Sequence, residues 1–149
     1  MSLSDASESD LLKLLFQNVT WAGMGDVTGL VGSTAAGSLF VSLHTADPGE
    51  TGNQTTNETA YTNYTRIAVV RSAVGWTVSG TAPTQVANAA AATFPQCGAT
   101  GATITFFAIG KSASGVGEIL DSGALTASLI VSNGISPSFD PGTLVTTAD

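Results

Sequence analysis

The sequence has little charge. Only 10% of its 149 residues are Asp, Glu, Lys or Arg, whereas an ordinary soluble domain carries about 25%. Ser, Thr, Ala and Gly are abundant throughout the chain, so small neutral residues must cover much of the surface. Because interspersed charge normally keeps protein surfaces apart, such a surface is poorly protected against association. We therefore expect part of it to be covered in an assembly.

Basic residues are especially scarce. The chain has 11 acidic and 4 basic residues, which gives a net charge of -7. The basic ones are scattered along the sequence: Lys13, Arg66, Arg71 and Lys111. Nucleic-acid binding requires a cluster of basic residues to neutralise phosphates, and attraction to an anionic membrane surface requires the same. Neither nucleic acid nor membrane is an expected partner.

Cysteine and long apolar runs are also missing. The single Cys97 permits no disulfide within the chain, which is typical of a reducing compartment, although it could still pair between chains. No apolar run approaches the roughly 20 residues needed to span a bilayer. The acidic start MSLSDASESD lacks the basic and apolar regions of a secretory signal. We expect synthesis and folding in a cytoplasm.

Catalytic constellations are not evident either. The only histidine, His44, has Asp47 three residues later, but no G-x-S-x-G signature provides a nucleophile. An isolated histidine at a strand end is more often structural than a general base. We expect no enzyme activity and assign no catalytic residue, and a hydrolase is only a remote alternative.

A metal site finds little support in the sequence. One His and one Cys cannot supply a four-ligand zinc site. The acidic stretch of residues 47–58 could offer oxygen ligands to calcium, but its spacing does not match an EF-hand loop. We expect neither a metal nor another cofactor.

The chain divides into a helical preface, residues 1–18, and a β body, residues 38–149. Asp5 is the predicted N-cap of the helix, with Glu8 as its capping-box partner. A wide apolar stripe follows, made of Leu11, Leu12, Leu14, Leu15 and Phe16. This stripe is expected to pack on the domain's own sheet, with docking on a neighbouring subunit as the alternative.

Eight strand-like segments separated by turn signals fill the β body. They cover residues 39–45, 64–71, 75–80, 86–95, 103–111, 118–125, 128–133 and 143–148. The second and third are expected to pair across a short turn, and residues 19–37, which include Asp26, are expected to be irregular. Because no second helix interrupts the strands, a βαβ architecture is excluded. The sequence predicts a mainly β fold, a single-domain β-sandwich resembling a jelly roll over residues 1–149, with a short N-terminal helix.

The loop of residues 46–58 is the candidate contact site. Its start, Ala46 to Gly49, fits a type II turn, and its three carboxylates occur without a basic residue, which suits a partner surface that bears Arg or Lys. Two tyrosines follow, and they either join the contact or cap the domain's own core. The candidate protein-contact residues are Asp47, Pro48, Gly49, Glu50, Asn53, Asn57, Glu58, Tyr61 and Tyr64.

Several stretches together resemble a known family. They are LLKLLFQNVTWAGMGDVTGL, SLFVSLHTADPGETGNQTTNE, YTRIAVVRS, GWTVSG and FFAIGKSASGVGEIL. The sequence is similar to small virion proteins of tailed bacteriophages and prophages, which are labelled as tail fibre proteins or as head decoration or cement proteins. The resemblance covers nearly the whole chain and implies a structural role in the virion, without a catalytic motif.

A capsid decoration or cement protein that binds and stabilises the particle is the favoured function, because a fibre shaft should show long repeats or heptads and this chain has neither. The expected partners are the major capsid protein or other virion proteins, and the chain itself as a dimer or trimer. The alternative is a tail fibre protein or a receptor- or carbohydrate-binding module of the tail tip. The expected location is the virion, after synthesis in the host cytoplasm.

Overall fold

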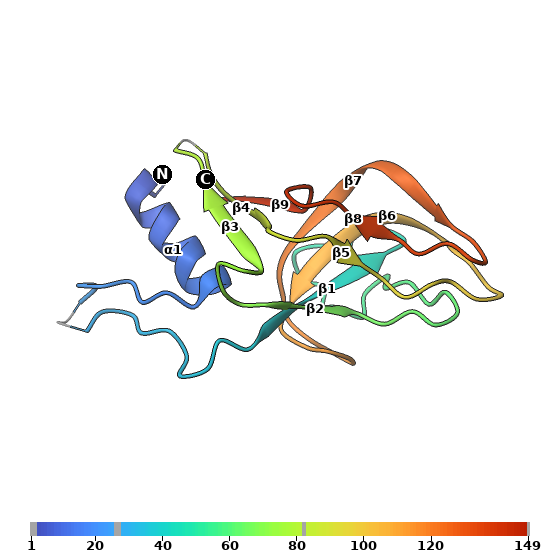
Figure 1. The fold of residues 1–149 in the computed structure, drawn as a ribbon, viewed down its shortest axis with the longest axis horizontal. Coiled ribbons are helices and arrows are strands. Elements are labelled where there is room, and N and C mark those ends of the chain that lie inside the picture. Colours follow the sequence, from blue (N-terminus) through green and yellow to red (C-terminus); the bar gives the residue numbers. More distant parts are fainter. Residues whose placement is uncertain (1–2, 26–27, 82, 149) are drawn as a thin grey trace. The chain divides into compact units, whose positions relative to one another are not determined.

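The computed structural model describes residues 3–25, 28–81 and 83–148, so Asp26 lies outside the described residues. Contacts within the chain divide it into two units. Unit 1 comprises Met1–Ser38, Val70–Ala91 and Asp140–Asp149, and unit 2 comprises Leu39–Val69 and Ala92–Phe139. The predicted mainly β fold with one short N-terminal helix is confirmed (Figure 1).

Unit 1 contains the helix, α1 (Asp5–Gln17), whose N-cap is Ser4 and not Asp5 as expected. The Ser4 side chain accepts a hydrogen bond from the Ser7 backbone N–H, which satisfies one of the free donors of the first turn. Glu8 therefore does not close a capping box: its carboxylate is buried and accepts from the backbone N–H of Thr84. The helix ends at Asn18, which adopts the left-handed conformation with φ of 59°.

The sheet of unit 1 has the order β3 (Trp76–Ser79), β4 (Thr84–Asn88) and β9 (Val145–Ala148), all antiparallel. Its inner face packs against α1, where the rings of Phe16 and Trp76 meet edge to face at 5.1 Å. Gln17 also donates to the Trp76 carbonyl at 2.8 Å. Phe16 and Leu12 are almost fully buried, so this part of the expected stripe packs on the chain's own sheet, whereas Leu11, Leu14 and Leu15 are half-buried.

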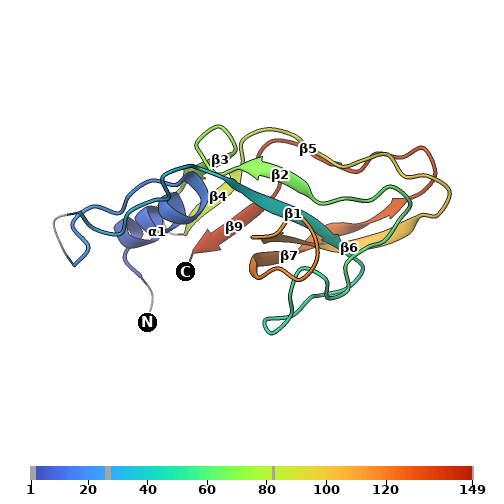
Figure 2. The same cartoon turned by 90° about the horizontal axis from the view of Figure 1, so that it is seen from below.

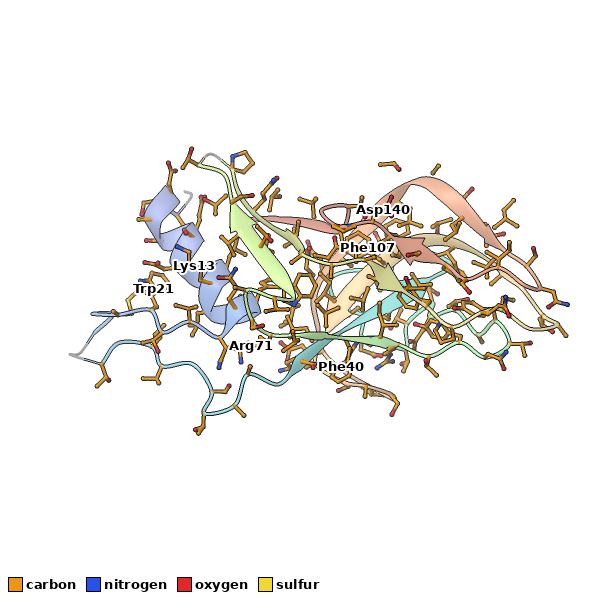
Figure 3. All side chains as sticks on the ribbon, viewed as in Figure 1. Lys13, Trp21, Phe40, Arg71, Phe107 and Asp140 are labelled. Carbon is orange, nitrogen blue, oxygen red and sulfur yellow. The ribbon has the colours of Figure 1, made fainter. Side chains whose placement is uncertain are left out.

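Unit 1 also contains an irregular segment, residues 19–37, which we call the arm. It has two legs that run side by side from the C-terminal end of α1 (Figures 1 and 2). Trp21 and Leu30 join the legs through two backbone hydrogen bonds of 2.9 and 3.0 Å. Arg71 lies at the base of the arm (Figure 3), where it donates to the carbonyls of Leu14 and Leu15 and to the Ser33 hydroxyl.

Unit 2 is built on a four-stranded antiparallel sheet with the order β2 (Ile67–Val70), β1 (Ser38–His44), β6 (Ala102–Gly110) and β7 (Ile119–Val131). Strands β1 and β6 pair Val41 with Ile109 and Leu43 with Phe107, which puts four buried apolar side chains on one face. The opposite face carries Ser42 and His44 from β1.

A short two-stranded sheet, β5 (Ala92–Thr93) and β8 (Ser138–Phe139), completes unit 2. Its aromatic side chains extend the core, because Phe139 contacts both Phe94 at 6.2 Å and Phe107 at 6.4 Å between ring centroids. Such edge-to-face and tilted contacts add about 0.5–1.5 kcal/mol each beyond the burial of apolar area.

Three details of the predicted strands are wrong. First, β2 and β3 do not pair with each other, because the turn after Arg71 redirects the chain and the Trp76 ring of β3 packs on Phe16 while β3 pairs with β4. Second, residues 86–95 form two strands, since the Asn88 side chain donates to the carbonyls of Ala90 and Asp140 and so ends β4.

The third correction concerns residues 118–133, which form one strand, β7, and not two. The polar residues after Leu125 resemble a turn in the sequence, but the sheet accommodates them as a bulge. Phe106 faces Ala124 while Ile104 faces Leu129, so residues 125–128 all lie opposite the single Thr105.

Candidate functional site

The predicted contact loop, residues 46–58, is held by its own unit along much of its length. Its return leg pairs with the end of β1: Thr45 N–H donates to the Asn57 carbonyl and Thr59 N–H donates to the Leu43 carbonyl, both at 2.9 Å. Gly49 has the expected positive φ, 70°, and its N–H donates to the Asp47 carboxylate at 2.8 Å, but the hydrogen-bonded turn comes later, where Gly52 N–H donates to the Gly49 carbonyl at 3.1 Å. The Asx bond therefore fixes the start of the loop.

Gln54 anchors the middle of the loop, and its side chain is fully buried. Its amide oxygen accepts from Ser112 N–H at 2.9 Å, and its amide nitrogen donates to the Phe40 carbonyl at 3.3 Å. The side chain fits against Gly110 and Gly117, where a Cβ would come within 2.2 Å of its atoms. Any larger residue at these two glycines would displace Gln54, so the loop and the β6–β7 hairpin depend on each other.

Glu58 closes the loop through an ion pair that is mostly buried. Its carboxylate accepts two hydrogen bonds from Arg66, at 2.7 and 2.8 Å, and a third from the Tyr64 hydroxyl at 2.9 Å. The exposed fractions of the Arg66 and Glu58 side chains are only 3% and 16%. Arg66 also donates to the carbonyls of Ser112 and Gly115, which ties the β6–β7 hairpin to the loop.

The pKa shifts of Arg66 and Tyr64 are consistent with their burial and their hydrogen bonds to Glu58. The hydrogen bonds to Glu58 raise the pKa of the Arg66 guanidinium and outweigh the opposing effect of its burial. Burial raises the pKa of Tyr64 far above its usual range, so its hydroxyl stays a donor to Glu58 at every ordinary pH. The same hydroxyl accepts from Leu43 N–H at 3.0 Å. Glu58 and Tyr64, two candidate contact residues, thus serve an internal network.

Tyr61 is 2% exposed, and its hydroxyl donates to the Pro95 carbonyl at 3.0 Å. Burial raises its pKa to about 12. Its ring lies edge to face with that of Tyr64 at 5.3 Å, and Tyr64 in turn stacks on Phe94. Of the two interpretations left open for these tyrosines, the structure favours a place in the core of unit 2.

Four of the candidate contact residues are exposed, three in the first half of the loop and Asn57 in the second. Asp47, Gly49 and Glu50 are exposed, whereas Pro48 between them is buried. Asp47 and Glu50 line an open cavity of about 360 Å³ together with Asp121 of β7. Asn53 caps the following turn with its side chain, which accepts from Thr55 N–H, and Asn57 has φ of 55° and donates to the Asp47 carbonyl.

His44 is fully buried on β1, and both of its ring nitrogens have partners. Nδ1 lies 2.8 Å from the Thr56 carbonyl, which fixes it as the donor, and Nε2 lies 2.9 Å from the Ser42 hydroxyl. Burial lowers the pKa of His44. The hydrogen bond to Thr56 and the charge of Glu58 oppose this shift, and the charge of Arg66 adds to it. The Ser42–His44 pair resembles part of a catalytic dyad, but both side chains are fully buried, so we interpret His44 as structural.

Cys97 is a free thiol and is 2% exposed. Its Sγ contacts the carbonyls of Gly98 and Thr100 at 3.4 Å. Pairing between chains would require this part of unit 2 to open. Among the described residues, no group of three or more His, Cys, Asp or Glu side chains is arranged to hold a metal ion, and no helix there is long and apolar enough to cross a membrane.

Sequence reasoning missed the two residues that organise the site. Gln54 gave no signal, because a glutamine in a polar loop is normally solvated, and only the neighbouring glycines Gly110 and Gly117 hint at a side chain that needs room. Arg66 is one of four scattered basic residues in the sequence, and its only signal is that an arginine in a chain with so little charge favours pairing with a carboxylate.

Comparison with known families gives one match. A family model described as "Podophage GP4 fiber I protein gp80" matches residues 2–147. No curated protein matches the chain. The family match confirms the resemblance to phage virion structural proteins, and its name fits the tail fibre alternative better than the favoured capsid decoration function.

Proposed function

Because the chain belongs to the family of the podophage GP4 fiber I protein gp80, we propose that it is a structural component of a bacteriophage fibre. The family match over residues 2–147 carries this proposal. It replaces capsid decoration as the preferred function, since the argument for decoration was the lack of a repetitive shaft, and a fibre can also contain globular parts. The virion is accordingly its proposed location.

We place the chain in a globular part of the fibre and not in its shaft. The only helix of the described residues has 13 residues, too short for a coiled-coil shaft, and the sequence has no internal repeat. A non-enzymatic role is supported by the burial of Ser42 and His44, which leaves that pair without access to a substrate.

The exposed half of the loop remains our candidate contact with another fibre or virion protein. Asp47 and Glu50 carry the accessible carboxylates there, and an Arg- or Lys-bearing partner surface would complement them. Such rim charges affect orientation and association rate more than affinity. Gln54 and Glu58 are less suited to this contact, because both already bind within unit 2, whereas Asn57 is exposed and stays a candidate.

Imaging of the virion tests the proposed function. A small tag inserted between Ser114 and Gly115, in the exposed β6–β7 hairpin, should appear on fibres when particles are labelled and imaged by electron microscopy. Label spread over the capsid lattice would instead support a decoration protein. Particles that lack the chain should retain filled heads and lose fibre density, and intact fibres on such particles would contradict the proposal.

A further inference from the structure

The arm exposes apolar side chains without burying any of its own. None of the described residues 19–25 and 28–37 is buried, and none is charged. Four apolar side chains are exposed by 40 to 66% of their area: Val19, Met24, Leu30 and Val31. Ordering a chain costs about 1–2 kcal/mol per residue, and a segment without burial recovers little of that cost within its own molecule.

Despite this, the arm is held in a defined shape. The Asn18 side chain forms two hydrogen bonds with the Ser33 backbone, of 2.8 and 2.6 Å, and so joins the two ends of the arm. The Trp21–Leu30 bridge then aligns the legs. A segment that is positioned in advance loses less entropy when it meets a partner.

A second uncharged surface lies on the sheet of unit 1. The face turned away from α1, which we call the outer face, carries two cross-strand rows, Ser79–Gln85–Thr147 and Thr77–Ala87–Val145. None of its side chains is charged, and Val145 is 38% exposed. An open cavity of about 350 Å³ lies on this face, lined by Thr77, Ser79, Gln85, Ala87 and the turn at Pro141 and Gly142.

The distribution of charge on the protein indicates which partner could cover the arm and the outer face. Each copy carries a net charge of -7, so two copies repel each other overall, and a contact is least opposed where the touching surfaces carry few carboxylates. The outer face carries no charged side chain, and the arm contains a single one, Asp26, which lies outside the described residues. Two open cavities of unit 2 fit less well, because Asp47, Glu50 and Asp121 line one and Glu58 and Arg66 line the other. Apolar side chains placed there would desolvate charged groups at a cost.

We propose that the arm of one copy docks on the outer face of a second copy of this chain, so that copies join head to tail. The arm cannot reach its own outer face, because it leaves from the end of α1, and α1 covers the inner face of the same sheet. A contact between two different surfaces closes into a ring or continues as a filament. This inference rests on the proposed function, since a fibre assembled from several copies requires such a contact.

Mixing two variants tests the contact. L30D/V31D alters the arm, and T77E/V145E alters the outer face; both add negative charge, so the altered surfaces cannot attract each other. Analytical ultracentrifugation should show wild-type self-association beyond a dimer, whereas each variant alone stays monomeric. Their mixture should form a one-to-one dimer and nothing larger, because it contains one intact arm and one intact outer face per pair.

V116D is the matched control, because Val116 is 78% exposed on the β6–β7 hairpin and lies on neither surface. It should associate as the wild type does. Melting temperatures establish that the variants fold, and T147E replaces T77E/V145E if the double variant unfolds. Self-association of either altered variant at wild-type strength, or a mixture that stays monomeric, overturns the proposal.

A wild-type chain that stays monomeric at millimolar concentration also overturns it. That outcome would leave the proposed fibre function intact, because the position of the chain on the virion is measured separately by imaging. Conversely, label on the capsid lattice would contradict the fibre and leave the head-to-tail contact to be judged by the mixing experiment alone.

Discussion

The loop of residues 46–58 and the arm of residues 19–37 are similar in the sequence and different in the structure. Both are irregular, both lack Lys and Arg, and both contain small polar residues. Yet the loop buries Gln54 completely and engages Glu58 in an ion pair, whereas no described residue of the arm is buried. An irregular segment with buried anchors belongs to the fold, and one without them is available to a partner.

The largest expected effect comes from removing Arg66. R66M leaves the Glu58 carboxylate without its cation and the carbonyls of Ser112 and Gly115 without a donor. Breaking a buried pair by removing one partner costs about 3–5 kcal/mol of unfolding free energy, measurable by urea denaturation.

K111M is the control for this variant. Lys111 pairs with Glu118 on the surface, where the two side chains are 54% and 64% exposed. Loss of such a pair should change the unfolding free energy by about 0–1 kcal/mol. Equal losses in R66M and K111M would contradict the view that the Arg66–Glu58 pair anchors the loop.

A smaller effect is expected for Q54L, which keeps the approximate volume of the side chain and removes its hydrogen bonds. The Ser112 N–H and the Phe40 carbonyl would lose their partner, and a buried polar group without a partner costs about 1–3 kcal/mol. Q96L, which removes an exposed hydrogen bond to the Gly134 carbonyl, should change stability by less than about 0.5 kcal/mol. Denaturation midpoints that agree between the two variants would contradict a role of Gln54 as an anchor.

The lowered pKa of the buried His44 should make the free energy of unfolding depend on pH. Its pKa is lowered in the folded protein, so below the unfolded value of 6.5 the unfolded chain binds the proton more readily. Stability should therefore fall as the pH decreases through about 6.5 towards the lower folded pKa, by at most about 1.4 kcal/mol per pH unit. In H44Q the slope between pH 6.5 and 5 should disappear, and an unchanged slope would show that another group causes it.

The smallest effect is expected in the arm. L30D or V31D places a charge where the side chain is already 46% or 66% exposed, so the unfolding free energy of the monomer should change by less than about 0.5 kcal/mol. Thermal melts at low concentration measure this. A loss above about 2 kcal/mol in either variant would mean that the arm contributes to the core of unit 1.

The strands with regular alternation were predictable from the sequence. Alternation located β1 and β6 within two residues, and turn residues marked the β6–β7 hairpin. The sequence does not predict the position of β3 in its sheet, because that position depends on the contact between the Trp76 and Phe16 rings. A contact between residues so far apart in the chain leaves no local sequence pattern. The bulge in β7 was missed for a similar reason, since the four residues that lie opposite the single Thr105 resemble a turn.

The candidate site was predicted only in part. Asp47 and Glu50 are exposed and Gly49 has a positive φ, as the sequence predicts, but Pro48 is buried and the bonded turn begins only at Gly49. The polar composition of residues 50–57 gives no sign that Gln54 among them is fully buried. Local composition describes how polar a segment is, but burial depends on partners from other strands, here Gly110, Gly117 and Arg66.

Hydrogen–deuterium exchange at two protein concentrations tests the contrast between the loop and the arm most directly. In dilute, monomeric protein the amides of Gln54 and Thr59 should exchange slowly, because they donate to the carbonyls of Gly117 and Leu43 in both states. Apart from the hydrogen-bonded amides of Trp21, Leu30 and Ser33, peptides covering residues 19–25 and 28–37 should exchange rapidly when dilute and become protected when concentrated. Equal protection of the arm at both concentrations, or a loop that exchanges as fast as the arm, would contradict the account.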